Sequence, residues 1–336
     1  MELFKLYDVQ KYVSMTNHSW SGYNLIANLK VWLDGGTMLR IAVIYVLAWL
    51  GVVASASAQT CQTSPVAVQI LGSGGPRMTN DRASAGTLVW LNGKATIMVD
   101  AGGGSYRRFG ETGARPDDLS LMAFTHLHPD HVSALPALFW SLDQTRKAPP
   151  LPISGPSGND LVPGIRTFLN VLFDEKNGAF RVLGGLVGGS GRGVPLAVME
   201  TDVKKAEPST VFNRDGVTVT AIGVPHGEIP AVAYRVRAQN KSIVFSSDQN
   251  GSNPIFVEFS RDADVLVMHM AIAAGGTSPL HAAPAVVGRV ARDARVGRLV
   301  VSHIGQYDLD AAVADVKTAY TGPLTVGQDL LCVPVP

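Results

Sequence analysis

Three histidines and one aspartate occur within seven consecutive residues, THLHPDH, in a chain of 336 residues with only eight histidines. Imidazole and carboxylate groups are ligands of zinc, whose catalytic sites keep one position open for water. In an extended segment alternate side chains point the same way, so His126 and His128 can reach one metal ion together. Asp130 and His131 follow a proline that turns the chain, and they can reach a second ion. Two ions about 3.5–4 Å apart are a known arrangement for hydrolysis.

Three more candidate ligands follow later in the chain, each where a β-like run ends. His226 ends GVTVTAIGVPH, Asp248 ends KSIVFSSD, and His303 ends RLVVSH. Loops at strand ends are where sites collect on α/β scaffolds. Any one of these residues alone would be an ordinary polar side chain, and a histidine-rich turn without metal is the alternative for the first stretch. Three in series after that stretch favour a metal centre.

The elements that would position these residues alternate between strands and helices. Runs rich in Val, Ile and Thr that end in glycine predict strands from residue 66 onward. Apolar residues at helical spacing predict helices over 132–144, 165–175, 282–294 and 310–320. The glycine-rich stretch 184–193 lacks the Lys-Ser/Thr ending of a phosphate-binding loop, so it is predicted to be a flexible surface connection. No linker divides the chain after residue 59, which predicts a single α/β domain.

Composition narrows the class of partner. The chain is 46% hydrophobic and 16% charged, with a formal net charge of +1. This balance lacks the basic excess that binding to a long polyanion favours, so a nucleic-acid partner is disfavoured, though a local basic patch is compatible with a neutral total.

The residues before the domain have the layout of a secretory signal. Over 38–58, Arg40 precedes an apolar run from Ile41 to Ala54, and Ala56-Ser57-Ala58 follows as a cleavage site. The run is shorter than the ~20 residues that span a bilayer, which favours a cleaved signal over a membrane anchor. The expectation is a periplasmic or secreted protein, or a membrane-anchored one if the segment stays uncleaved. Residues 1–37 are a leader of doubtful status, and 59–336 form the expected hydrolase domain.

Two cysteines, Cys61 and Cys332, lie at opposite ends of that domain. In an oxidising compartment they could form one disulfide that ties the ends together. Two unpaired thiols are the alternative.

From Val66 to Asp308 the chain resembles the metallo-β-lactamase superfamily, and within it the ribonuclease Z-like branch. THLHPDHVSALPALF resembles the T-H-x-H-x-D-H stretch of that branch, and VDAGGG its D-x-G turn. VPHGEIPAVAYRV, FSSD, SPLHAAPAV and LVVSHIGQY resemble its later histidine and aspartate segments. Seven of the eight histidines find a place in this pattern.

The resemblance implies a four-layer αββα sandwich with two zinc ions, for which manganese or iron could substitute. It places the first ion on His126, His128 and His226, and the second on Asp130, His131 and His303, with Asp248 bridging both. A bridging water would become hydroxide near neutral pH and attack phosphorus or another electrophilic centre. Asp130 would also orient that water, and His281 would donate a proton to the leaving oxygen. His269 is expected to pack or to support a ligand, because it ends a strand.

Two departures from the resemblance bear on the substrate. Met270 stands where the family has the glutamate that pairs with the proton-donating histidine, so the acid step suits a better leaving group than an RNA hydroxyl. The 22 residues from His226 to Asp248 leave room for a hairpin but not for a tRNA-binding arm.

The favoured hypothesis is therefore a dinuclear zinc hydrolase of small phosphodiesters or sulfate esters. A tRNA 3′-end endoribonuclease and a non-catalytic metal-binding protein are the alternatives. Relatives of this branch are often dimers, so a homodimer is a further expectation.

Overall fold

The computed structural model describes residues 61–145, 150–188 and 195–336, without the side chains of 143–145 and 188. The expected leader and signal segment, 1–58, therefore lie outside the described residues. Within the described part of the chain, no helix has the length and apolar character needed to cross a bilayer.

The first sheet has seven strands in the order β14-β1-β2-β3-β4-β5-β6. They are β1 (Val66–Gly72), β2 (Gly86–Leu91), β3 (Lys94–Ala101), β4 (Leu121–Ala123), β5 (Leu151–Pro156), β6 (Leu196–Thr201) and β14 (Cys332–Pro334). Strands β14, β1, β2 and β3 pair antiparallel, whereas β3 to β6 pair parallel.

The second sheet also has seven strands, in the order β13-β12-β11-β10-β9-β8-β7. They are β7 (Ser209–Arg214), β8 (Val217–Val224), β9 (Ala231–Ala238), β10 (Lys241–Phe245), β11 (Val265–His269), β12 (Leu299–Ser302) and β13 (Leu324–Val326). Strands β7 to β10 form an antiparallel meander, and β10 to β13 pair parallel.

The helices of the described residues flank these sheets. They are α2 (Ser105–Glu111), α3 (Pro129–Val132), α4 (Leu135–Thr145), α5 (Ile165–Phe173), α6 (Gly185–Gly188), α7 (Pro254–Phe259), α8 (Pro284–Asp293) and α9 (Leu309–Lys317). The four helices predicted from sequence are confirmed as α4, α5, α8 and α9. The prediction of a flexible loop at 184–193 is wrong for 185–188, because Leu186 is buried in the core and holds a helical turn there.

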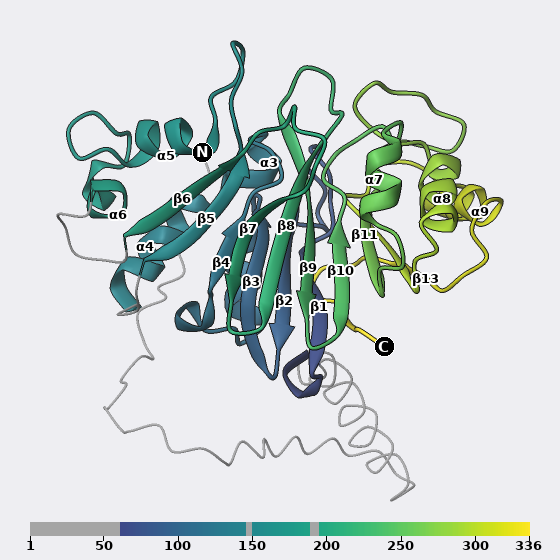
Figure 1. Ribbon diagram of the computed structural model, residues 1–336, viewed down its shortest axis with the longest axis horizontal. Coiled ribbons are helices and arrows are strands. Elements are labelled where there is room, and N and C mark those ends of the chain that lie inside the picture. Colours follow the sequence, from purple (N-terminus) through teal and green to yellow (C-terminus); the bar gives the residue numbers. More distant parts are fainter. Residues whose placement is uncertain (1–60, 146–149, 189–194) are drawn as a thin grey trace, which may run out of the picture. The chain divides into compact units, whose positions relative to one another are not determined.

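Three separate clusters of buried side chains show how the layers stack. Alternation along the strands sends neighbouring residues to opposite faces. In β12, Val300 joins the cluster between the two sheets, whereas Leu299 and Val301 join the cluster under α7, α8 and α9. A third cluster packs the other face of the first sheet against α4 and α5. The result is the predicted αββα sandwich, with α4 to α6 on one side and α7 to α9 on the other (Figure 1).

The two cysteines are joined. Cys61 and Cys332 form a disulfide with their Cα atoms 5.6 Å apart, which settles the alternative that the sequence left open. Next to this bond, Val333 of β14 pairs with Val68 of β1. The last strand is therefore fixed to the first both covalently and by backbone hydrogen bonds.

Candidate metal centre

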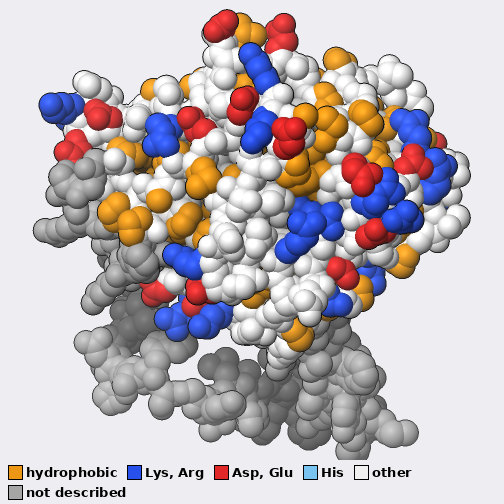
Figure 2. Space-filling model, in the orientation of Figure 1, with side chains coloured by type: hydrophobic (Ala, Val, Ile, Leu, Met, Phe, Trp, Pro, Cys, Tyr) orange, Lys and Arg blue, Asp and Glu red, His pale blue; other side chains and the backbone are white. Residues whose placement is uncertain are grey.

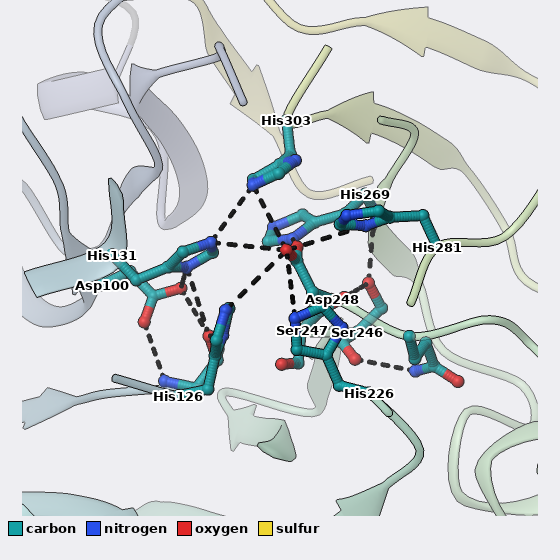
Figure 3. A network of polar contacts seen from close by, with 12 residues as sticks. Asp100, His126, His131, His226, Ser246, Ser247, Asp248, His269, His281 and His303 are labelled. Carbon is teal, nitrogen blue, oxygen red and sulfur yellow. Dashed lines mark hydrogen bonds and ion pairs between the residues drawn. The ribbon is translucent and has the colours of Figure 1, made fainter. Parts of the chain in front are cut away.

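The predicted ligands meet because six strands end at the same place. Strands β3 and β4 run parallel, as do β10, β11 and β12, and β8 shares their direction because both β8 and β10 are antiparallel to β9. Hydrogen bonds join the sheets beside the site: Val232 N donates to Thr125 O (2.8 Å), and the Tyr234 hydroxyl donates to Phe124 O (3.0 Å). Residues from both halves of the chain are thus brought to one cluster (Figure 3).

Backbone conformation helps to turn these side chains inward. Asp100, Ser247 and His303 have φ values of 59°, 62° and 56°. Non-glycine residues rarely adopt this left-handed region, and such strain concentrates at functional sites. Asp100 is the penultimate residue of β3, Ser247 lies two residues after β10, and His303 directly follows β12.

The first donor set consists of His126, His128 and His226. Nδ1 of His128 lies 3.1 Å from Nε2 of His126 and 3.4 Å from Nε2 of His226. Asp248 Oδ2 lies 3.8 and 3.9 Å from the same two Nε2 atoms. Donors held ~2.0–2.1 Å from one tetrahedral ion are roughly 3.3 Å apart, so the nitrogen spacing fits a single zinc-sized ion.

The second donor set consists of Asp130, His131 and His303. Nε2 of His303 lies 3.1 Å from Nε2 of His131 and 3.1 Å from Oδ2 of Asp130. Asp248 Oδ2 lies 3.4 Å from His303 Nε2 and 3.7 Å from His131 Nε2. The same carboxylate oxygen of Asp248 therefore faces both donor sets, as a bridging ligand would.

His269 and His281 complete the cluster around Asp248. His269 Nδ1 contacts the other carboxylate oxygen, Oδ1, at 2.5 Å. This contact fits the predicted supporting role, although His269 also lies among the side chains that could themselves hold an ion with His131, Asp248 and His303. His281 Nδ1 lies 3.7 Å from Asp248 Oδ2, so the predicted proton donor is at the site.

The outer nitrogens of three histidines are held by partners that fix the rings. His226 Nδ1 faces Leu280 O at 2.9 Å, and His131 Nδ1 faces Asp100 Oδ2 at 2.9 Å. The Thr125 hydroxyl donates to Asp100 Oδ2 and lies 3.1 Å from His126 Nδ1. Such outer partners leave the inner nitrogen free to bind a metal.

Asp100 and Thr125 were not predicted as functional residues. The one signal in the sequence is their position, since Asp100 stands in the VDAGGG turn and Thr125 immediately precedes the first histidine.

Burial sets the protonation of the first donor set. It lowers the pKa of His126 well below its ordinary value, with His131 adding to the effect, and it also lowers the pKa of His128 and His226. These rings are consequently neutral near pH 7, the form that binds a metal.

The pKa shifts around the second donor set have a different cause, because carboxylates lie next to its imidazoles. Burial would lower the pKa of His131, but the carboxylates of Asp100 and Asp248 raise it well above the ordinary value. Burial would raise the pKa of Asp248, but His303 and His131 hold it well below the ordinary value.

Among the described residues, no lysine or arginine pairs with Asp248. It is 2% exposed, and within the described part of the chain all of its ion-pair partners are histidines. Of these histidines, His131 has a raised pKa, whereas burial lowers the pKa of His126, His226, His269 and His281. A buried carboxylate among mostly neutral imidazoles is costly, and bound cations would offset that cost. The two His/Asp groups that share Asp248 therefore fit a pair of metal ions.

Comparison with known proteins agrees with this geometry. Residues 95–304 match the Beta-lactamase superfamily domain. The chain belongs to the metallo-β-lactamase superfamily. The match spans the THLHPDH stretch and reaches past His303.

Within this superfamily the chain is distantly homologous to ribonuclease Z. It is 31% identical to "Ribonuclease Z" of Mycobacterium avium over 187 residues, which are 54% of this chain and 62% of that protein. The alignment thus covers less than two thirds of the relative's length. A 26% identity to "Ribonuclease Z" of Mycobacterium bovis extends over 282 residues, 78% of this chain and 96% of that one.

Among solved structures, human tRNase Z, short form, is similar in fold. It has a TM-score of 0.64 at 18% identity and covers 80% of this chain and 99% of its own.

Proposed function

We propose that this chain is a dinuclear zinc hydrolase that cleaves a small phosphodiester or sulfate ester. One observation carries the proposal: a single oxygen, Asp248 Oδ2, faces two donor sets whose nitrogen and oxygen atoms are spaced for one ion each. Histidine and carboxylate donors in small shells are typical of zinc. Two such ions, when bound, would make a water molecule acidic and polarise the ester.

The protein's own groups would position the reactants. Asp130 is 12% exposed, compared with 2% for Asp248, so Asp130 is the carboxylate that can accept a hydrogen bond from a reacting water. His303 Nε2 lies 3.1 Å from Asp130 Oδ2. Burial would raise the pKa of Asp130, but His303 and His131 lower it, and a cation bound in place of their protons would favour the ionised carboxylate in the same way. Asp130 therefore stays ionised and able to hold the water's proton.

The leaving group in this proposal needs little help from an acid. Burial lowers the pKa of His281 to about 4, so its imidazole is neutral at neutral pH and can donate only an uncharged N–H. Met270, which stands where the family has a glutamate, is fully buried in the core beneath α7 to α9. Without a carboxylate there, an aryl or similarly acidic alcohol is a better leaving group than a ribose hydroxyl.

Processing of tRNA is the competing function, and it rests on the names of the relatives. The interval from His226 to Asp248 is occupied by β9 and β10, which form a hairpin rather than a binding arm. On the face in Figure 2, basic and acidic side chains are interspersed and do not gather into one basic surface. Binding of tRNA depends on several phosphate contacts from Lys and Arg. These observations support the smaller substrate.

Export belongs to the same proposal. A disulfide between Cys61 and Cys332 is stable in oxidising compartments, and the segment at 38–58 has the layout of a signal. Cell fractionation of the full chain, with a tag at its C-terminus, would find the protein outside the cytoplasm. Recovery with the cytoplasmic fraction would contradict export.

The activity is tested on purified protein loaded with zinc. We expect about two zinc ions per chain and turnover of bis-p-nitrophenyl phosphate or an aryl sulfate. Asp130→Ala abolishes this turnover, whereas Asp117→Ala, at an exposed aspartate, leaves it intact. Cleavage of a tRNA precursor alone would favour the endoribonuclease. Two bound ions without turnover of esters, tRNA precursor or a β-lactam would favour a non-catalytic metal-binding protein.

A further inference from the structure

A cavity of about 330 Å³ adjoins the metal centre at His281. His281 lines this cavity and also lies 3.7 Å from Asp248 Oδ2 through its Nδ1 atom. A group that occupies the cavity would therefore lie next to the end of the site where His281 faces Asp248 (Figure 3). The volume is at the lower end of the range for small-molecule pockets, which suits one ring system rather than a polymer.

Three loops from distant parts of the sequence form the walls of the cavity, and each contributes an apolar side chain. Pro76 follows β1, Ile272 follows β11, and Ile304 follows β12. Two polar side chains of the lining are already hydrogen-bonded: Gln306 Nε2 donates to Met78 O (3.0 Å), and the Tyr307 hydroxyl donates to Met270 O. An apolar, flat group such as an aromatic ring matches these walls.

The loop that carries Pro76 and Arg77 is held against the site. Gly75 N donates to Ile304 O (3.2 Å), and Ile304 N donates to Ser73 O (2.8 Å). A Cβ atom at Gly75 would lie 3.2 Å from His303 Cε1, so a larger residue there would require a shift of a few tenths of an ångström between this loop and His303. The backbone on either side of Arg77 is thus held by hydrogen bonds, at Ser73 and Gly75 before it and at Met78 O after it.

Arg77 gives the cavity lining a positive charge that no acidic residue of the lining offsets. It is the only Lys, Arg, Asp or Glu among the lining residues, and it is exposed. Among the described residues Arg77 has no ion-pair partner, unlike Arg82 and Arg108, which pair with nearby carboxylates. A guanidinium at the edge of an apolar cavity favours a ligand that combines a ring with a negative charge.

We infer that the cavity receives the leaving alcohol of the ester, and that Arg77 selects an aromatic or heterocyclic alcohol that carries its own carboxylate or phosphate. This inference rests on the proposed hydrolysis. In that reaction the oxygen of water forms a bond to phosphorus, and the bond from phosphorus to the alcohol oxygen breaks. The alcohol leaves with the electron pair, takes up one proton and remains briefly between His281 and Arg77. The second product is a phosphate monoester.

The kinetic test uses two methyl aryl phosphodiesters that differ only at the ring, one with a carboxylate and one with the isosteric carboxamide. Arg77→Gln should lower kcat/KM for the carboxylate about tenfold, and change the carboxamide less than about twofold. Arg77→Lys should restore part of the preference, and the preference should decline with added salt. Arg292→Gln, at an exposed arginine on α8, should change neither substrate.

Binding is measured separately, by ligand-observed NMR with free 4-hydroxybenzoate and 4-hydroxybenzamide on the zinc-loaded protein. The wild type should prefer the carboxylate, and Arg77→Gln should abolish that preference. An equal effect of Arg77→Gln on both esters, or an unchanged preference in binding, would overturn the inference. Absence of turnover together with a binding preference that depends on Arg77 would instead contradict the proposed hydrolysis and leave the pocket supported.

Discussion

Two neighbouring polar clusters of this molecule each contain a buried carboxylate, and they differ in how its charge is balanced. One is the histidine cluster around Asp248. The other, the Asp329 cluster, consists of Ser73, Arg82, Arg108 and Asp329. Asp329 is 6% exposed and accepts hydrogen bonds from Ser73 N, Ser73 Oγ, Ala83 N and Arg108 Nε, at 2.8–3.0 Å. Its charge is balanced by a guanidinium of the same chain.

In the part of the chain that the structure describes, Asp248 has no guanidinium partner. Its neighbours are imidazoles, and several of their nitrogens face one another at 3.1–3.4 Å, where at most one proton can lie between each pair. The difference separates a structural site from a binding site. The Asp329 cluster has its own guanidinium, whereas the histidine cluster has only a protonated His131 to set against Asp100, Asp130 and Asp248, and bound cations would balance it. The Asp329 cluster joins the loop after β1 to the segment before β14, and so holds the loop that carries Arg77.

The largest expected effect comes from replacing the shared carboxylate. Asp248→Asn removes the bridging charge, so we expect zinc content to fall from about two ions per chain to less than one. Turnover should drop roughly a thousandfold or more, since removal of a single stabilising group in an active site already costs about 10²–10³. Elemental analysis measures the zinc content, and ester hydrolysis measures the turnover. Retention of two ions by the variant would contradict the bridging role.

The matched change in the other cluster should act on stability instead. Asp329→Asn weakens charge-assisted hydrogen bonds to Arg108 and to the loop, and we expect the free energy of unfolding to fall by about 1.5–3 kcal/mol. Zinc content should stay near two. Urea unfolding measures the change, with Asp262→Asn as control, because Asp262 pairs with Arg295 on the surface and its loss should shift the midpoint little. If Asp329→Asn instead released zinc, the two clusters would not be separable.

The smallest predicted effect is a difference in the pH dependence of zinc binding between the two donor sets of the histidine cluster. Burial keeps His126, His128 and His226 neutral, so zinc at the first donor set should bind almost equally well from pH 7.5 to 6. The pKa of His131 is raised, so zinc at the second donor set must displace a proton. Affinity there should fall up to about tenfold per pH unit below that pKa. The expected sign is loss of the second ion as pH decreases.

Zinc per chain, measured at buffered free zinc across this pH range, checks the prediction. Asp100→Asn removes the carboxylate beside His131 Nδ1 and should flatten the pH dependence of the second ion. Parallel loss of both ions with decreasing pH would show that the two donor sets do not differ in protonation.

The sequence predicts the histidine cluster well because strand ends carry its ligands. His126 to His131 are contiguous, and His226, Asp248 and His303 each follow a run of β-branched residues. Parallel strands bring such ends to one edge, so residue type and position in the strand favour a metal centre. The division of the ligands between two ions comes from the family resemblance. The four-layer architecture is expected from the family resemblance, and the residues alone predict only an α/β domain. Continuous apolar runs such as VLVMH of β11 agree with it, because a strand covered on both faces has few polar residues.

The Asp329 cluster could not be predicted in this way. Asp329 contacts residues more than 200 positions away, and no local pattern marks an aspartate that will meet Ser73 and Arg108. The pairing of Cys61 with Cys332 was equally open, because it depends on β14 joining β1 at the edge of the sheet. The prediction of a flexible loop at 184–193 relies on the glycines there. The burial of Leu186 outweighs the flexibility that these glycines suggest.

The most direct test is a crystal structure of the zinc-bound protein with anomalous scattering recorded at the zinc edge. We expect two anomalous peaks, both within about 2.0–2.2 Å of Asp248 Oδ2. One should lie beside the nitrogens of His126, His128 and His226, and the other beside Asp130, His131 and His303. A single peak, or an Asp248 carboxylate that contacts neither ion, would contradict this expectation.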